Sequence, residues 1–162
     1  MKPPKGLFVA PASFGILATL LSVALARMPE ACPGFCICDM WLKLRRAACV
    51  NKNLYSVQTG LPAIVQALDL SNNSVSSLGN FELANIGLTR LKYLNLSGNS
   101  INEIDLNAFT ALDDLAVLDL SRNHLYYVLE DTFANSKSLK ILRLDENNFN
   151  SDIPRLRSSY IK

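Results

Sequence analysis

The side chains that could do chemistry in this chain are mainly its cysteines. All four of them, Cys32, Cys36, Cys38 and Cys49, fall in one short segment. Four thiolates so close together can hold a zinc ion tetrahedrally, or they can form two disulfides. Disulfides form and persist in oxidising compartments, so the destination of the chain decides between the two. Because the cysteines are clustered, we expect a local staple rather than a framework running through the protein.

A hydrolytic triad is the second candidate chemistry, and the predicted geometry argues against it. His124 is the only histidine, and Asp119 and Ser121 are near it in sequence. Asp119 and Ser121 lie on or beside a predicted strand, whereas His124 falls past the following turn, and no oxyanion site is evident. The acidic pairs at 113–114 and 130–131 lack the spacing of a calcium loop. We therefore expect no enzyme activity, no cofactor and no metal.

The N-terminus has the composition of a secretion signal. Lys2 and Lys5 precede an unbroken run of apolar or small residues at 16–25, and we expect cleavage after Ala26. The alternative is an uncleaved signal-anchor, because 7–26 is without charge and long enough to span a bilayer. A proline and a glycine interrupt its first half, which favours cleavage. Removal of residues 1–26 would place the chain outside the cell, where the cysteines form disulfides rather than a zinc site.

Charge and composition indicate the kind of protein and the kind of partner. The apolar fraction of 49% and the charged fraction of 19% are those of a globular chain, and the length suits one domain. Once Lys2 and Lys5 are removed with the signal, fourteen basic residues balance fourteen acidic ones. A net charge near zero argues against nucleic acid or an anionic membrane surface as the main partner.

A repeat runs through the rest of the chain. The frame Leu-x-x-Leu-x-Leu-x-x-Asn begins at Val65, Leu91, Leu115 and Leu139, so successive units are 26, 24 and 24 residues apart. Leucines two apart lie on one face of a strand. A unit this short cannot bury that face alone, so the units stack, their strands pair in parallel and the inward leucines merge into one core.

The asparagine of each frame stands just after the strand, where the chain turns sharply. A carboxamide can donate to and accept from the backbone groups that the turn leaves unpaired. We therefore predict a buried asparagine ladder made of Asn73, Asn99, Asn123 and Asn147. The first unit is two residues longer than the others, which predicts a bulged outer loop.

These features resemble the leucine-rich repeat, and the cysteine cluster resembles the N-terminal cap of extracellular proteins of that family. The resemblance implies an α/β solenoid: a horseshoe arc with short parallel strands on its concave face and a disulfide-bonded cap. It also implies pairing of Cys32 with Cys38 and of Cys36 with Cys49. The leucine spacing extends back through Leu44 into the cap, so we expect the cap to add one strand to the sheet.

The chain is then divided into a signal peptide at 1–26, a cap at 27–62, about four repeats at 63–150 and a tail at 151–162. The tail has none of the cysteines of a C-terminal cap. An uncovered last repeat exposes a sheet edge and apolar side chains. This leads to the hypothesis that the chain is a truncated product of a longer receptor-like or secreted protein.

Residues between the leucines of each strand point to the concave face, where a ligand would bind. The predicted protein-binding residues combine an apolar and aromatic centre with charges at its rim, as interfaces do: Tyr93, Val117, Asp119, Ile141 and Arg143. The alternative is that these residues only favour strand formation. Asn72 and Asn95 begin N-x-S triplets and are predicted glycosylation sites, with Asn95 in the middle of this face.

The sequence most resembles animal leucine-rich repeat adhesion and receptor proteins, such as the Kekkon-, Slit- and Connectin-like proteins. The resemblance implies a secreted or cell-surface module that binds a protein ligand or receptor in adhesion or signalling. A secreted soluble modulator of immune or inhibitor type is the alternative to cell-surface recognition, and the truncated product is a third. The residues do not identify the ligand or the oligomeric state.

Overall fold

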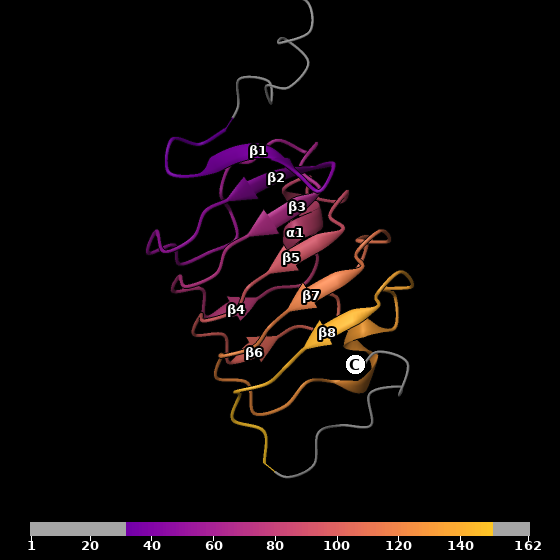
Figure 1. Cartoon of the computed structure of the whole chain (residues 1–162). Coiled ribbons are helices and arrows are strands. Elements are labelled where there is room, and N and C mark those ends of the chain that lie inside the picture. Colours follow the sequence, from indigo (N-terminus) through magenta and orange to yellow (C-terminus); the bar gives the residue numbers. More distant parts are fainter. Residues whose placement is uncertain (1–31, 151–162) are drawn as a thin grey trace, which may run out of the picture.

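The computed structural model describes residues 32–150, in which ten short elements follow one another along stacked coils (Figure 1). The predicted signal peptide at 1–26, the first residues of the predicted cap and the predicted tail at 151–162 lie outside the described residues. A six-stranded sheet contains β1 (Ile37–Trp41), β2 (Leu44–Ala48), β3 (Ala67–Asp69), β5 (Tyr93–Asn95), β7 (Val117–Asp119) and β8 (Ile141–Arg143). β4 (Ser77–Leu78) and β6 (Glu103–Ile104) form a second, two-stranded sheet.

The repeat frame accounts for the large sheet. From β2 to β8 the strands are parallel, and each pairs with the strand of the next coil in the same register. The central leucines, Leu68, Leu94, Leu118 and Leu142, therefore stand side by side, and all are buried. At roughly 1.5–3 kcal/mol for each fully buried large apolar side chain, this row is a main source of stability. The predicted fold class, a leucine-rich solenoid with parallel strands, is confirmed.

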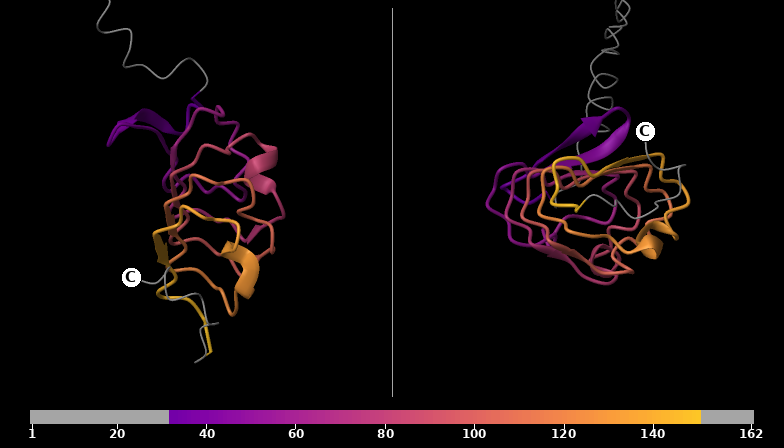
Figure 2. Two further views of the ribbon diagram at one scale, coloured as in Figure 1. Left: turned by 90° about the vertical axis from the view of Figure 1, so that its right-hand side faces the viewer. Right: turned by 90° about the horizontal axis from the view of Figure 1, so that it is seen from below.

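Helical turns lie on the side of the coils opposite the sheet. Figure 2 shows α1 (Glu82–Asn85) and the 3-10 helix η1 (Glu130–Phe133) on that side. Phe109 and Phe133, from successive coils, fill the core behind them and stack with ring centroids 5.6 Å apart. In the first repeat, where a bulged loop was predicted, the outer segment forms α1. Buried Leu83 there takes the place that Phe109 and Phe133 hold in their own coils.

The cap contains two strands, so the prediction of one was incomplete. β1 turns back through Leu42 and Lys43 and pairs antiparallel with β2, which lies beside β3. Both turn residues have positive φ, 47° and 65°. Two consecutive positive φ values are typical of a type I′ hairpin, which usually carries Asn-Gly. Leu42 and Lys43 stand there instead, so the residue types do not predict the turn.

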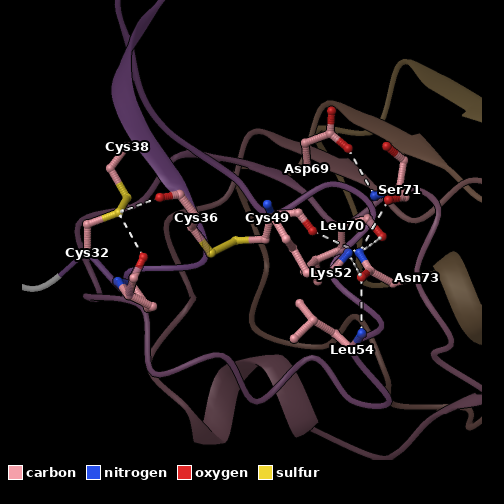
Figure 3. The surroundings of a disulfide bond; sticks show 11 residues. Cys32, Cys36, Cys38, Cys49, Lys52, Leu54, Asp69, Leu70, Ser71 and Asn73 are labelled. Atoms are coloured by element: carbon pink, nitrogen blue, oxygen red, sulfur yellow. Dashed lines mark hydrogen bonds between the residues drawn. A yellow bond between two sulfur atoms is a disulfide. The ribbon is translucent and has the colours of Figure 1, made fainter.

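Two disulfides close the cap, Cys32–Cys38 and Cys36–Cys49 (Figure 3). These are the pairs that the family resemblance implied. Cys49 is completely buried and belongs to the hydrophobic core, whereas Cys32 and Cys38 are partly exposed. The second disulfide therefore ties the β1 segment directly to the interior of the first coil.

The asparagines form a ladder along the turns after the strands. Asn123 donates from Nδ2 to the carbonyl oxygens of Leu96 and Leu120, each at 3.0 Å, and its Oδ1 accepts the N–H of Ile101 at 3.0 Å. Asn99 makes the equivalent bonds one coil earlier. Each of these carboxamides thus joins its own coil to the preceding coil through backbone groups that would otherwise be buried without partners.

Within residues 32–150 there is no helix with the length and apolar character needed to cross a membrane.

Candidate protein-binding face

The concave face is the solvent side of the six-stranded sheet, and each parallel strand presents two side chains to it. The strand registers arrange these side chains in two rows. The first row is Arg46, Ala67, Tyr93, Val117 and Ile141, and the second row is Ala48, Asp69, Asn95, Asp119 and Arg143. Neighbours in a row come from adjacent strands, so they are about 5 Å apart at the backbone. The predicted binding residues are therefore brought together on one face.

An aromatic cluster occupies the cap end of this face. The hairpin of β1 and β2 stands out from the coils on the side of the sheet (Figure 2). Trp41 at its end packs against Tyr93, with the ring centroids 5.1 Å apart and the planes tilted by 60°. Ala67 separates Arg46 from Tyr93 in the first row and is completely buried. Trp41 was missed in the sequence analysis because the strand that carries it was not predicted.

Burial changes the acidity of the Tyr93 phenol. Loss of hydration raises its pKa above the ordinary value of 10.0, and the nearby carboxylates of Asp69 and Asp119 add to the rise. Asn95 and Arg143 act in the opposite direction. Tyr93 is thus a neutral hydrogen-bonding side chain at physiological pH, half-buried among charged neighbours.

An ion pair holds the cap hairpin together above the face. Arg46 donates to both carboxylate oxygens of Asp39, with Nε 2.8 Å from Oδ1, and its guanidinium lies 5.8 Å from the ring centre of Trp41. The hydrogen bonds from Arg46 hold the pKa of Asp39 below its usual value, against a smaller opposing effect of burial. The same contact raises the pKa of Arg46. Because this pair is partly exposed, it fixes geometry more than it adds stability.

The other end of the face is more open. Ile141 on the last strand is 37% exposed, and Val117 beside it is partly exposed. The side chain of Arg143 in the second row is 62% exposed. This end therefore offers an aliphatic surface next to a largely exposed cation, which is paired on one side with Asp119.

Asp119 lies in the second row of the face, but it is buried. Asp119 is only 8% exposed. Its Oδ1 accepts the backbone N–H of Ser121 at 3.0 Å and the Ser121 hydroxyl at 2.6 Å, and Arg143 lies 3.4 Å from Oδ2. An aspartate side chain can accept a hydrogen bond from the backbone N–H two residues later, and this bond holds the Asp119 carboxylate against the turn. Asp119 positions Arg143 and the turn, and does not itself offer a free charge.

The same bonds give no catalytic arrangement. Ser121 donates directly to Asp119, so no imidazole stands between them as a triad requires. His124 is exposed, and its backbone N–H donates to Ile101. Within residues 32–150, no group of three or more His, Cys, Asp or Glu side chains is placed to hold a metal ion.

The two glycosylation candidates lie in different places. Asn72 is exposed at the turn after β3, in the left-handed region with φ 56°, and belongs to neither row. Asn95 is partly exposed in the second row, on the middle one of the five parallel strands.

Comparison with known proteins gives consistent matches. A family described as "Leucine rich repeat" matches residues 89–149. Trophoblast glycoprotein of Macaca fascicularis is 38% identical over 112 residues, which cover 68% of this chain and 26% of that protein. Leucine-rich repeat-containing protein 3 of Danio rerio is 35% identical over 121 residues, covering 74% of this chain and 45% of that protein.

A solved structure is similar in fold as well as in sequence. Human 5T4, also titled Wnt-activated inhibitory factor 1 and trophoblast glycoprotein, matches with a TM-score of 0.63 and 35% identity. The match covers 74% of this chain and 43% of that chain. This chain spans less than half the length of each of these relatives.

Proposed function

We propose that this chain, which matches the leucine-rich repeat family and has two disulfides at its N-terminal end, is an extracellular module that binds another protein through its concave face. The relatives include trophoblast glycoprotein, leucine-rich repeat-containing protein 3 and the leucine-rich repeat-containing G-protein coupled receptor 5 of Xenopus tropicalis. The two disulfides support an oxidising compartment. Recognition at the cell surface in adhesion or signalling is the role that these relatives favour.

One observation carries the proposal for the face. Tyr93, Val117 and Ile141 come from three adjacent strands in register and lie side by side on the concave face. The leucine that follows each of them in its strand faces the core. Trp41 extends this row at the cap end and Arg143 lies beside it at the other end. Tryptophan, tyrosine and arginine are the residues enriched where binding energy concentrates. An interface centred on this row would be apolar in the middle and charged at the edge.

Substitution of Ile141 tests the proposal with little risk to the fold. We expect Ile141→Asp to abolish binding of the secreted, labelled chain to cells that the wild-type chain binds, because it places a charge in the apolar centre. Tyr127→Asp is the matched control. Tyr127 is also a large exposed residue, at 56%, but it occupies the position of Glu103 on the flank of β4 and β6.

Both variants should be secreted and should show the same circular dichroism as the wild type. Equal binding of Ile141→Asp and wild type, or equal loss in both variants, would remove the concave face from the proposal. Arg143→Glu by itself should weaken binding to a partner that presents an acidic group.

A secreted soluble modulator is the second candidate function, and the balanced charge and the disulfide-closed cap suit it equally. Recovery of the chain from the medium without cell-surface binding activity would favour that role.

A further inference from the structure

One carboxamide stands between two carboxylates in the second row of the concave face. Asp69, Asn95 and Asp119 occupy equivalent positions, and each Oδ1 accepts the backbone N–H of the serine two residues later, at 3.0, 2.9 and 3.0 Å. In the preceding and following coils, an aspartate accepts the same hydrogen bond from the serine N–H. The local structure therefore accounts for the side-chain oxygen of Asn95 but not for its nitrogen.

The Nδ2 atom of Asn95 is not held by the backbone. It donates to no backbone carbonyl within residues 32–150, and the side chain of Asn95 instead interacts with the Tyr93 phenol, whose pKa it lowers. The buried, unpartnered side-chain polar atoms of this part of the chain are the hydroxyls of Thr59 and Thr132, so Nδ2 of Asn95 reaches solvent. Ser97 completes the triplet Asn95-Leu96-Ser97, which is an acceptor for N-linked glycans in secreted chains.

We propose that Asn95 carries an N-linked glycan, and that this glycan restricts access to the middle of the concave face. The first half of the proposal is independent of the proposed function, and the second half rests on it. The oligosaccharide comes from a lipid-linked diphosphate donor. The bond from the sugar C1 to the diphosphate oxygen breaks, a bond from C1 to Nδ2 forms, the lipid diphosphate leaves, and Nδ2 loses one proton.

The position of Asn95 decides what the glycan covers. Tyr93 is two residues away on the same strand and face, and Val117 and Asp119 are on the next strand. Ile141 and Arg143 are two strands away, at about 10 Å by the usual strand spacing. A glycan on Asn95 therefore covers the aromatic centre and leaves the β8 end open, so that a partner approaches over Ile141 and Arg143.

Asn72 provides the internal comparison. Its carboxamide is exposed and lies against Gly98, where a Cβ atom would come within 2.4 Å of Oδ1. The following coils carry Arg122 and Glu146 at the position of Gly98. Because Asn72 is outside both rows, a glycan there leaves the concave face uncovered.

The acceptor is tested by mass, without any ligand. The chain is expressed in secreting animal cells as wild type, Asn95→Asp, Ser97→Ala and Ser74→Ala. Asn95→Asp keeps the Oδ1 acceptor that Asp69 and Asp119 use, so it should fold. We expect Asn95→Asp and Ser97→Ala each to lose the mass of one glycan, and peptide N-glycosidase to convert Asn95 of the wild type to aspartate. Ser74→Ala should leave the glycan on Asn95 in place. Wild-type mass in both Asn95→Asp and Ser97→Ala would overturn the proposal.

The fluorescence of Trp41, the single tryptophan of the chain, tests whether the glycan covers the aromatic cluster. Trp41 packs on Tyr93, so a glycan beside Tyr93 should lower the quenching of tryptophan fluorescence by acrylamide. We expect quenching to rise after enzymatic deglycosylation of wild type and of Ser74→Ala, and to stay constant in Asn95→Asp.

A glycan on Asn95 whose removal changes neither quenching nor cell binding would overturn the covering half. The proposed function fails separately, if Ile141→Asp binds cells as the wild type does.

Discussion

The two faces of the same parallel strands follow opposite rules. On the inner side and in the turn that follows, every repeat carries aliphatic residues at the same positions and the same asparagine, which donates to a carbonyl of its own coil and to one of the coil before it. On the concave face the first row changes from arginine to alanine, tyrosine, valine and isoleucine. Stacking requires identity from coil to coil, because each side chain must fit the one above it. A binding surface for one partner needs residues that differ from strand to strand. In this chain such variation occurs on the concave face, where the packing of one coil on the next does not restrict the side chain.

The largest effect should come from the middle of the ladder. We expect Asn123→Ala to lower the free energy of unfolding by about 3–5 kcal/mol, because it leaves the Ile101 N–H and two or more carbonyls buried without partners. Urea denaturation followed by circular dichroism measures it. Val117→Ala on the concave face should cost under about 1 kcal/mol, since Val117 is partly exposed.

The end of the ladder sharpens the contrast. Asn147 makes the same kinds of bonds as Asn123 but is only partly buried, so water can replace them. Asn147→Ala should cost about 1–2 kcal/mol. If Asn123→Ala cost no more than Val117→Ala, the division between a structural side and a free side would be mistaken.

The next effect concerns the start of the ladder. Asn73 donates to the carbonyl of Cys49, whose disulfide to Cys36 spans 13 residues (Figure 3). Replacing both cysteines by serine should cost about 3 kcal/mol by loss of chain restriction in the unfolded state. Removal of Cys32–Cys38, which spans 6 residues at the surface, should cost less. Denaturation under oxidising conditions compares the two double variants, and equal losses would contradict a special link between the buried disulfide and the ladder.

The smallest effect belongs to the concave face and depends on pH. The pKa of Tyr93 is raised in the folded state, so the phenol is neutral in both states below pH 10. As pH rises from 10 through the folded pKa, the unfolded chain ionises first and stability falls. In an ultraviolet absorbance titration, Tyr93 should ionise above the ordinary tyrosine pKa of 10.0.

Two variants check this assignment. Tyr93→Phe should remove the late-titrating group, and Trp41→Ala should bring it back toward its ordinary pKa by exposing the ring. A titration curve unaltered by both would show that the aromatic cluster does not form as described.

Local regularity explains which predictions succeeded. The spacing of Leu68, Leu94, Leu118 and Leu142 predicted the sheet, and the fixed position of Asn123 and its equivalents predicted the ladder. Both depend only on what each repeat must share with the next. The hairpin was missed because its turn residues, Leu42 and Lys43, adopt positive φ without the glycine or asparagine that usually marks such a turn.

The concave face was only partly predictable. Its strand positions put Tyr93, Val117 and Ile141 in one row, as expected. The burial of Asp119 follows from a bond to Ser121, and the cover over Tyr93 follows from Trp41, which is 52 residues earlier in the chain. Neither contact recurs from repeat to repeat, so the repeat pattern of the sequence does not predict it.

The sequence alone determined that the chain coils, how many residues each coil takes and which side chains face inward, because burial of a repeated apolar face has one solution for all repeats. The tertiary structure alone decided which of the outward residues are accessible. That depends on the hairpin folding over one end of the sheet and on side-chain bonds between neighbouring coils, and both are set by contacts that occur once in the molecule.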